Sequence, residues 1–382
     1  MAFEHYIRSG QKMLRCGYTT GTCAALAAAG AARLLLTGQR PALLCLRTPK
    51  GWPVEVEPAA LERAQGLARC AVRKDAGDDA DVTDGMLVWA SVRLTGAPGV
   101  QIDGGEGVGR VTKPGLDQPV GAAAINRVPR RMIAEAVQAE LDAAGCRGGA
   151  EVVISIPGGA ERARRTFNPL LGIEGGLSVL GTSGVVEPMS EQAIVDTIGV
   201  ELRQAFCACP QGRLILTPGN YGADFLAANG LGALGVPVVR CSNFIGEALD
   251  MAAAEEFSAV LLVGHVGKLV KLAGGIMNTH SRSADCRTEL FCAHAAAAGA
   301  STALCRALLD APTTDACIAL LDTAGLRAAV LDSLTAAAQR HLERRAAGAY
   351  RVGVELFSNE YGPLGASPAA LELIEQWRND RL

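Results

Sequence analysis

Short apolar runs set the rhythm of the second half of the chain. They cover residues 152–156, 177–180, 214–217, 236–240 and 259–263, and glycine-rich loops follow them. Runs of this length, rich in branched residues, predict strands buried on both faces. Most of the loops lead into helical stretches, and this alternation predicts a largely parallel sheet. Loops at the carboxyl ends of such strands meet at one edge of the sheet, where α/β proteins bind ligands.

The first half of the chain mixes helical and strand patterns without this alternation. Alternating apolar residues predict a hairpin over 43–57 and strands over 67–73 and 86–94. One helix is predicted between Thr22 as N-cap and Gly38 as C′ residue, and another over 129–144. We therefore predict an α+β domain over residues 1–150. Residues 151–382 should form an α/β domain with a largely parallel sheet and a helical C-terminal part.

Composition narrows the class of ligand. The net charge of −3, the isoelectric point near 6.0 and an aromatic content of 4% give no footprint for nucleic acid or an anionic membrane. The N-terminus lacks the pattern of a signal peptide, and polar residues interrupt the apolar stretches 23–36 and 291–309. The 12 cysteines include no CxxC pair, which indicates reduced thiols. We expect a cytoplasmic protein with a small-molecule ligand, without nucleic acid or membrane, and leave open whether it is a homo-oligomer.

The stretch 257–287 concentrates polar chemistry. Its apolar run ends in His265, and Lys268 and Lys271 follow at a spacing that places both on one side of a helical turn. His280 and Asp285 lie in the loop beyond Gly274-Gly275. Each residue alone could be an ordinary strand-end histidine or part of a solvated face. Together they predict a loop that binds an anionic ligand.

Two groups of polar residues in the first half allow two interpretations each. Thr19, Thr20 and Thr22 precede or open a helix, so their hydroxyls could bind an anion or simply cap a helix that packs inward. The loop KDAGDDADVTDG (74–85) carries five aspartates but lacks the calcium-loop spacing. It is either a solvated turn or a site for magnesium or a carboxylate base.

Several longer motifs together resemble one family, the CbiD-type cobalt-precorrin-5B (C1)-methyltransferases of anaerobic cobalamin synthesis. The matching stretches run in order along the chain: GYTTGTCAA (17–25), KDAGDDADVT (74–83), VTKPGL (111–116), AIN (124–126), VPR (128–130), LGTSGVVEPMSE (180–191), GNYG (219–222), CSNFIGEALD (241–250) and GHVGKLVKLAGGIMNTHS (264–281).

The resemblance implies methyl transfer from S-adenosylmethionine to C1 of a cobalt-bearing, ring-contracted macrocycle, giving cobalt-precorrin-6A. It also implies a fold unrelated to that of the other precorrin methyltransferases. Cobalt would enter only as part of the substrate, and we expect no metal site built by the protein. The substrate carries many carboxylates, which basic side chains near helix starts can bind. The residues assigned to it are Thr19, Thr20, Thr22, Lys113, Arg127, Arg130, Arg131, Asn243, Lys268 and Lys271.

The methyl donor is assigned to two glycine-rich loops, with Glu187 available to hold ribose hydroxyls. These loops supply Gly181, Thr182, Ser183, Gly184, Glu187, Asn220, Tyr221 and Gly222. A carbon that gains a methyl group must lose a proton, and the acceptors considered are Glu187, His265, His280 and Asp285. His265 is preferred, for accepting the proton or for orienting the substrate, because a strand end is rigid.

Two other classes remain on the residues alone. A nucleotide-dependent oxidoreductase would need G-x-G-x-x-G after a strand, and the loop after Leu180 offers only Gly181 and Gly184. A non-catalytic carrier of an anionic small molecule would need only the basic loops. Binding of S-adenosylmethionine would distinguish a methyltransferase from both.

Overall fold

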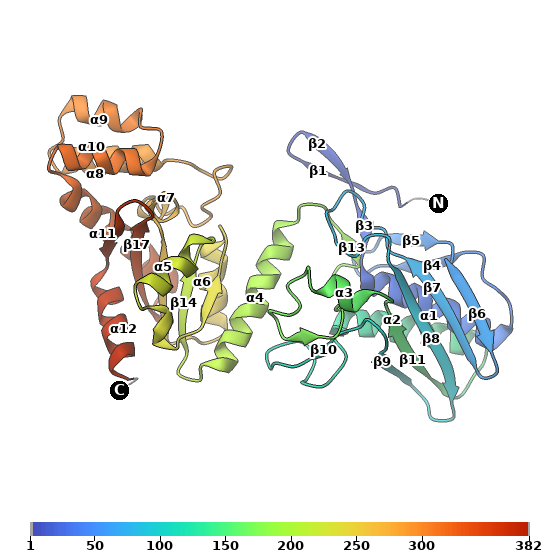
Figure 1. The fold of residues 1–382 in the computed structure, drawn as a ribbon. Coiled ribbons are helices and arrows are strands. Elements are labelled where there is room, and N and C mark those ends of the chain that lie inside the picture. The colour runs from blue at the N-terminus through green and yellow to red at the C-terminus, as the bar shows by residue number, and fades with distance from the viewer. Residues whose placement is uncertain (1–2, 381–382) are drawn as a thin grey trace. The chain divides into compact units, whose positions relative to one another are not determined.

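The computed structural model describes residues 3–380 and divides into two compact units, Met1–Glu191 and Gln192–Leu382. In Figure 1 the first unit runs from blue to green and the second from yellow-green to red. The division falls after Glu191 and not after residue 150, because the strand Gly149–Ser155 pairs inside the first unit's sheet. The predicted mixture of α and β structure, with a parallel sheet in the second half, is confirmed.

The first unit is rich in short strands and has two long helices. Its strands are β1 (Tyr6–Ser9), β2 (Lys12–Arg15), β3 (Gly17–Tyr18), β4 (Leu44–Arg47), β5 (Pro53–Val56), β6 (Ala60–Ala64), β7 (Leu67–Arg73), β8 (Leu87–Thr95), β9 (Val100–Gly104), β10 (Arg110–Val111), β11 (Gly149–Ser155), β12 (Ile173–Glu174) and β13 (Val185–Val186). Its helices are α1 (Thr20–Thr37), α2 (Arg127–Ala143) and α3 (Gly159–Ala163).

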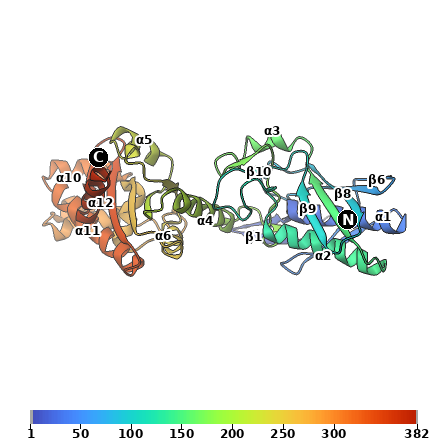
Figure 2. The same ribbon diagram turned by 90° about the horizontal axis from the view of Figure 1, so that it is seen from below.

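A five-stranded sheet in the order β6-β7-β8-β11-β9 organises this unit. Its pairs are antiparallel except β11 with β9. One face, with Val72, Ala90 and Val152, packs in a single core with α1 and α2. These two helices lie side by side in Figure 2. The opposite face is partly solvated, as antiparallel sheets commonly are.

Helix α1 is the core helix of the first unit. Its N-cap is Thr19, whose hydroxyl accepts the Thr22 N–H at 3.2 Å, so the predicted cap at Thr22 was wrong by one turn. Gly38 ends the helix in the left-handed region, with φ 74°, as predicted. By length and composition alone, α1 could cross a membrane. This was not predicted from the sequence, where only the shorter apolar stretch 23–36 was considered. The structure buries 78% of α1, as expected for a core helix.

The second unit alternates strands and helices. Its strands are β14 (Arg213–Thr217), β15 (Val238–Arg240), β16 (Ala259–His265), β17 (Arg351–Ser358) and β18 (Gly362–Ala366). Its helices are α4 (Glu191–Ala208), α5 (Tyr221–Ala228), η1 (Gly232–Leu234), α6 (Ile245–Ala254), α7 (Val266–Leu269), η2 (Val270–Gly274), α8 (Arg287–Ala297), α9 (Thr302–Leu309), α10 (Thr314–Thr323), α11 (Arg327–Ala346) and α12 (Pro368–Asn379).

The second sheet has the order β15-β14-β16-β17-β18 and is parallel except for β18. Helices cover both faces: α5 and α12 pack on one, and α4, α6 and α11 on the other. Two strands were not predicted, since β17 and β18 lie in the part expected to be helical. The run 177–180, predicted as a strand of this sheet, makes only isolated bridges inside the first unit.

Candidate active site

The carboxyl ends of β14, β15, β16 and β17 gather polar residues at one edge of the second sheet. We call this set the strand-end cluster: Gly219, Asn220, Tyr221, Ser242, Asn243, His265, Lys268 and Ser358. From β14 the chain goes to β15 on one side and then returns to β16 on the other. The connectivity therefore reverses between β14 and β16. Ligands of open α/β sheets bind outside the strand ends at such a switch point.

Lys268 lies at this switch point. Its side chain is half-buried in α7, and Nζ is 3.5 Å from the Ser242 carbonyl oxygen. A Cβ atom added to Gly219 would lie 3.4 Å from the same Nζ, so the loop after β14 passes directly beside the ammonium group. Burial lowers the pKa of Lys268. Within residues 3–380 it forms no ion pair.

His265 ends β16 and acts as the N-cap of α7. Its Nδ1 accepts the Gly267 N–H at 3.0 Å. Burial lowers the pKa of this imidazole, and the charge of Asp315 opposes that shift. A neutral ring that accepts at Nδ1 carries its proton on Nε2. His265 therefore presents a donor at Nε2, and could accept a proton only at Nδ1 by giving up the cap. This geometry favours the orienting role over the proton acceptor.

Ser358 and Asp315 were not predicted as site residues. Ser358 ends β17, and its hydroxyl donates to Asp315 Oδ1 at 2.6 Å, which ties the first turn of α10 to the strand edge. The signal that could have found Ser358 is the period-two pattern of Val352, Val354 and Leu356, all buried on one face of β17.

The loop over 278–287 is held together largely by its own polar groups. Lys271 is 2% exposed and donates to the carbonyl oxygens of Thr279 at 3.1 Å and Ala284 at 2.8 Å. Lys271 and Lys268 therefore do not form the predicted pair of free cations on one side of a helical turn. His280 accepts the Arg282 N–H at Nδ1, 3.1 Å away, and is thus a second Nε2–H donor. The exposed Asp285 pairs with Arg287, whose guanidinium lowers the pKa of the carboxyl.

The neighbouring predicted residues divide into exposed and structural ones. Asn220 and Tyr221 are exposed, Tyr221 by 60%. Gly222 is buried, and a Cβ there would lie 1.6 Å from Thr217 Oγ1, so only glycine fits. Asn243 Oδ1 accepts the Thr279 hydroxyl at 3.3 Å, which links the loop after β15 to the 278–287 loop.

The three threonines at the start of α1 are structural. All are buried, and their hydroxyls have partners within the first unit. Thr20 donates to the Leu180 carbonyl at 3.3 Å, and Thr22 to the Gly184 carbonyl at 2.7 Å. Thr19 occupies the space that a Cβ on Gly181 would need. This arrangement supports the capped-helix interpretation, with the hydroxyls fixing the loop 181–184.

The two predicted donor loops lie in different units. Thr182 is exposed, and the Ser183 hydroxyl donates to the Val185 carbonyl at 3.0 Å. Glu187 forms an ion pair with Lys50, whose ammonium lies 4.4 Å from the centroid of the Trp52 ring. The Gly219–Gly222 loop belongs to the second unit. Each loop is therefore a separate candidate for the donor site, one in each unit.

The basic residues of the first unit differ in how free they are. Arg130 donates to the carbonyl oxygens of Ile125, Ala123 and Ile102, and is thus a brace between loop and sheet. Lys113 is exposed and donates to the Leu170 carbonyl at 3.2 Å. Arg127 and Arg131 are exposed, and Arg131 makes only a long contact, 3.9 Å, with Glu135. Lys113, Arg127 and Arg131 therefore remain available to an anionic substrate.

The aspartates of the acidic loop 74–85 bind partners inside the loop and on neighbouring segments. Asp75 pairs with Arg15 at 2.7 Å, and the nearly inaccessible Lys74 pairs with Asp81 at 2.9 Å. Asp84 Oδ1 accepts the Ala76 N–H at 2.9 Å. Within residues 3–380, no three His, Cys, Asp or Glu side chains converge as metal ligands would. The carboxylates therefore serve the turn.

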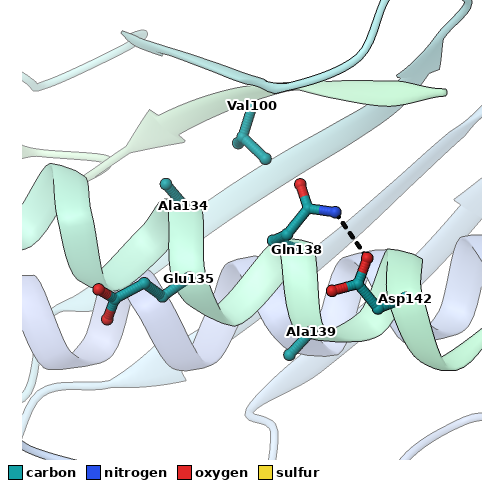
Figure 3. Close-up of a pocket in the computed structure, with 6 residues that line it drawn as sticks. All are labelled: Val100, Ala134, Glu135, Gln138, Ala139 and Asp142. Atoms are coloured by element: carbon teal, nitrogen blue, oxygen red, sulfur yellow. Dashed lines mark hydrogen bonds between the residues drawn. The ribbon is translucent and has the colours of Figure 1, made fainter. Parts of the chain in front are cut away.

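Surface depressions elsewhere do not match an anionic ligand as well. One, of about 430 Å³, lies over the outer side of α2 beside Val100. Figure 3 shows its carboxylates, Glu135 and Asp142, with Gln138 donating to Asp142 at 2.8 Å. Its lining has no cation, so it would repel the carboxylates of the predicted substrate. Another, of about 540 Å³, combines Arg162 and Arg165 with Asp84 and Glu161.

Comparison with known proteins decides the family. Two family models match the chain: CbiD over residues 7–188, and the CbiD C-terminal domain over residues 278–368. A protein of Ruminiclostridium cellulolyticum named cobalt-precorrin-5B C(1)-methyltransferase is 44% identical over 93% of this chain and 92% of its own. The chain belongs to the CbiD family.

Other CbiD relatives match over the whole length. A protein of the same name from Alkaliphilus metalliredigens is 40% identical over 97% of both chains. Another from Listeria monocytogenes is 39% identical over 98% of this chain and 100% of its own. A 1.9 Å crystal structure of the cobalamin biosynthesis protein cbiD from Archaeoglobus fulgidus is 30% identical. The match covers 73% of this chain and 86% of the crystallised chain, with a TM-score of 0.39.

Proposed function

We propose that this chain methylates cobalt-precorrin-5B at C1 with S-adenosylmethionine as donor, yielding cobalt-precorrin-6A in cobalamin biosynthesis. The observation that carries the proposal is identity of 40–44% over nearly the full length to proteins of that name. The expectation of a fold distinct from the other precorrin methyltransferases belongs to the same proposal and comes from the family resemblance.

We place the donor at the strand-end cluster of the second unit. Gly219 lies beside Lys268, and Gly222 lets the start of α5 pack directly on Thr217, so the loop after β14 is held close to the ammonium group. Asn220 and Tyr221 offer an amide and an exposed ring beside it. The donor supplies an electrophilic methyl group on a sulfonium that leaves as a neutral thioether. Glu187, which pairs with Lys50 in the first unit, is not part of this proposed donor site.

The chain's own residues would act by position more than by acid–base chemistry. Holding two reacting carbons in line and excluding water supplies much of the barrier reduction in such a transfer. His265 would donate from Nε2 to an oxygen or nitrogen of a bound ligand, because its Nδ1 is committed to Gly267. His280 would do the same from the neighbouring loop. A proton lost from the macrocycle would then pass to water or to Asp285.

The macrocycle would be bound through its carboxylates. Within the first unit, considered by itself, Lys113, Arg127 and Arg131 keep exposed charges of the kind that bind carboxylates. Arg130 and Lys271, which donate to backbone carbonyls, would shape the loops instead. Each charge-assisted hydrogen bond contributes roughly 1.5–3 kcal/mol, so a few exposed cations suffice.

Mass spectrometry of a single-turnover reaction tests the proposal. Purified protein, authentic cobalt-precorrin-5B and S-adenosylmethionine should give a macrocycle with one added methyl group, and one S-adenosylhomocysteine for each macrocycle consumed. Boiled protein is the control. Unchanged macrocycle in the presence of folded protein would contradict the proposal.

A further inference from the structure

Lys268 is a half-buried cation whose charge the protein leaves uncompensated. Its nearest acceptor is the Ser242 carbonyl oxygen at 3.5 Å, too long for a strong bond, and it has no ion pair among residues 3–380. The other buried lysines are satisfied: Lys271 by two carbonyl oxygens, and Lys74 by Asp81 at 2.9 Å. Removing an ammonium from water without a partner costs free energy. An anion supplied by a ligand would remove that cost.

The surroundings indicate which anion. Lys268 is the only half-buried cationic side chain in the strand-end cluster, and Arg240, which ends β15, is exposed, so the sheltered part of this edge matches a ligand with one carboxylate. A macrocycle with many carboxylates would need several cations. The other members are uncharged: the Tyr221 ring, 60% exposed, the amides of Asn220 and Asn243, and the hydroxyl of Ser242. An aromatic ring with nearby hydrogen-bonding groups suits a nucleoside.

The backbone around Lys268 is also built for close approach. Gly219 has φ 103°, a conformation that side chains disfavour, and lies beside Nζ. Ser242 is held at φ 52°, unusual for a residue other than glycine, and directs its carbonyl toward the ammonium. Strained residues of this kind cluster at ligand sites. Both flank the half-buried charge of Lys268 at the switch point.

We infer that Lys268 binds the α-carboxylate of the methionine part of S-adenosylmethionine, and not a carboxylate of the macrocycle as the sequence suggested. This inference rests on the proposed function and names the ligand group that the strand-end cluster recognises.

Calorimetry with a matched ligand pair tests it. S-adenosylmethionine and its decarboxylated analogue differ in the carboxylate alone. The unaltered protein should bind the former about ten- to hundred-fold more tightly, the range expected of one charge-assisted contact. Lys268→Met should bind both with similar affinity, whereas Lys268→Arg should keep the preference. Lys12→Met, which removes an exposed charge from β2, is the control and should match the unaltered protein.

The outcomes separate this inference from the function beneath it. If Lys268→Met keeps the full preference for the carboxylate, the inference is overturned. It is equally overturned if the variant loses affinity for cobalt-precorrin-5B while the preference persists, because Lys268 would then be a substrate anchor. If folded, unaltered protein binds neither donor, the proposed function fails as well. Circular dichroism of each variant confirms that it is folded.

Discussion

The imidazole of His265 combines a structural bond with a free donor, and the two can be separated by substitution. His265→Asn places an amide oxygen where Nδ1 accepts the Gly267 N–H, because asparagine is a good N-cap. It removes Nε2. We expect thermal stability close to that of the unaltered protein and turnover roughly 100-fold lower, as for loss of one positioned donor.

The complementary substitution is His265→Gln, whose amide nitrogen can take the place of Nε2. It should lose the cap, at a cost of about 1 kcal/mol, but retain more turnover than His265→Asn. Differential scanning calorimetry and single-turnover rates measure the two effects independently. Equal rates in both variants would show that the Nε2 donor has no role.

At the residue scale, the sequence identified which side chains are polar but not what they touch. Lys268 and Lys271 looked alike in the pattern. Among residues 3–380, however, Lys268 has only a 3.5 Å contact with the Ser242 carbonyl, whereas Lys271 donates to the carbonyl oxygens of Thr279 and Ala284. Arg130 similarly braces a loop through three carbonyls. Those acceptors are set by tertiary folding, and spacing along the chain carries no information about them.

The start of helix α5 depends on one missing side chain. Gly222 packs on Thr217, whose buried Oγ1 has no hydrogen-bond partner among residues 3–380. Gly222→Ala would force the helix away from β14, and we expect a loss of about 1–3 kcal/mol in the free energy of unfolding. In a Thr217→Ala background the same change should cost less, because the clashing hydroxyl is gone. Urea denaturation of the four proteins measures this coupling, and additive effects would contradict it.

At the scale of elements, the sequence correctly predicted the helices and strands whose hydrophobic pattern and boundary residues indicate the same limits. Strand β7 was predicted with its observed limits, Leu67–Arg73, and Gly38 ends α1 as predicted. Strand β17 was missed although Val352, Val354 and Leu356 alternate, since the surrounding chain is strongly helical. The run 177–180 has strand-like composition but makes only isolated bridges, to Val108 and Ile125, among the described residues.

A buried carboxyl couples the stability of the molecule to pH. Glu355 lies in β17 with Oε2 buried and unpartnered among residues 3–380, and burial raises its pKa. The unfolded chain then loses this proton at lower pH than the folded one. The folded state is consequently destabilised as pH rises from the ordinary glutamate range, about 4.3, through the raised pKa.

Glu355→Gln removes this charge while keeping the shape of the side chain. The variant should match the unaltered protein in acid and be more stable at neutral pH, with a smaller fall of melting temperature as pH rises. Glu360→Gln, an exposed position nearby, is the control and should not alter the profile. A neutral-pH melting temperature below that of the unaltered protein would show that the Glu355 charge is stabilised.

At the scale of the whole molecule, the sequence predicted two units and the character of each. It placed the boundary too early, because the rhythm of short strands begins at β11, which completes the first sheet beside β8 and β9. It assigned the donor to two glycine-rich loops, of which one lies in each unit. Composition reports the kind of element a segment forms, and pairing decides which sheet the segment joins.

The position of the transferred methyl group tests whether the chain is a C1-methyltransferase of cobalt-precorrin-5B. Cobalt-precorrin-5B is incubated with the protein and S-adenosylmethionine labelled with carbon-13 in its methyl group, and the product is examined by nuclear magnetic resonance. We predict a single labelled methyl group bonded to C1 of the macrocycle. A label on any other carbon, or an unlabelled macrocycle recovered from folded protein, would contradict it.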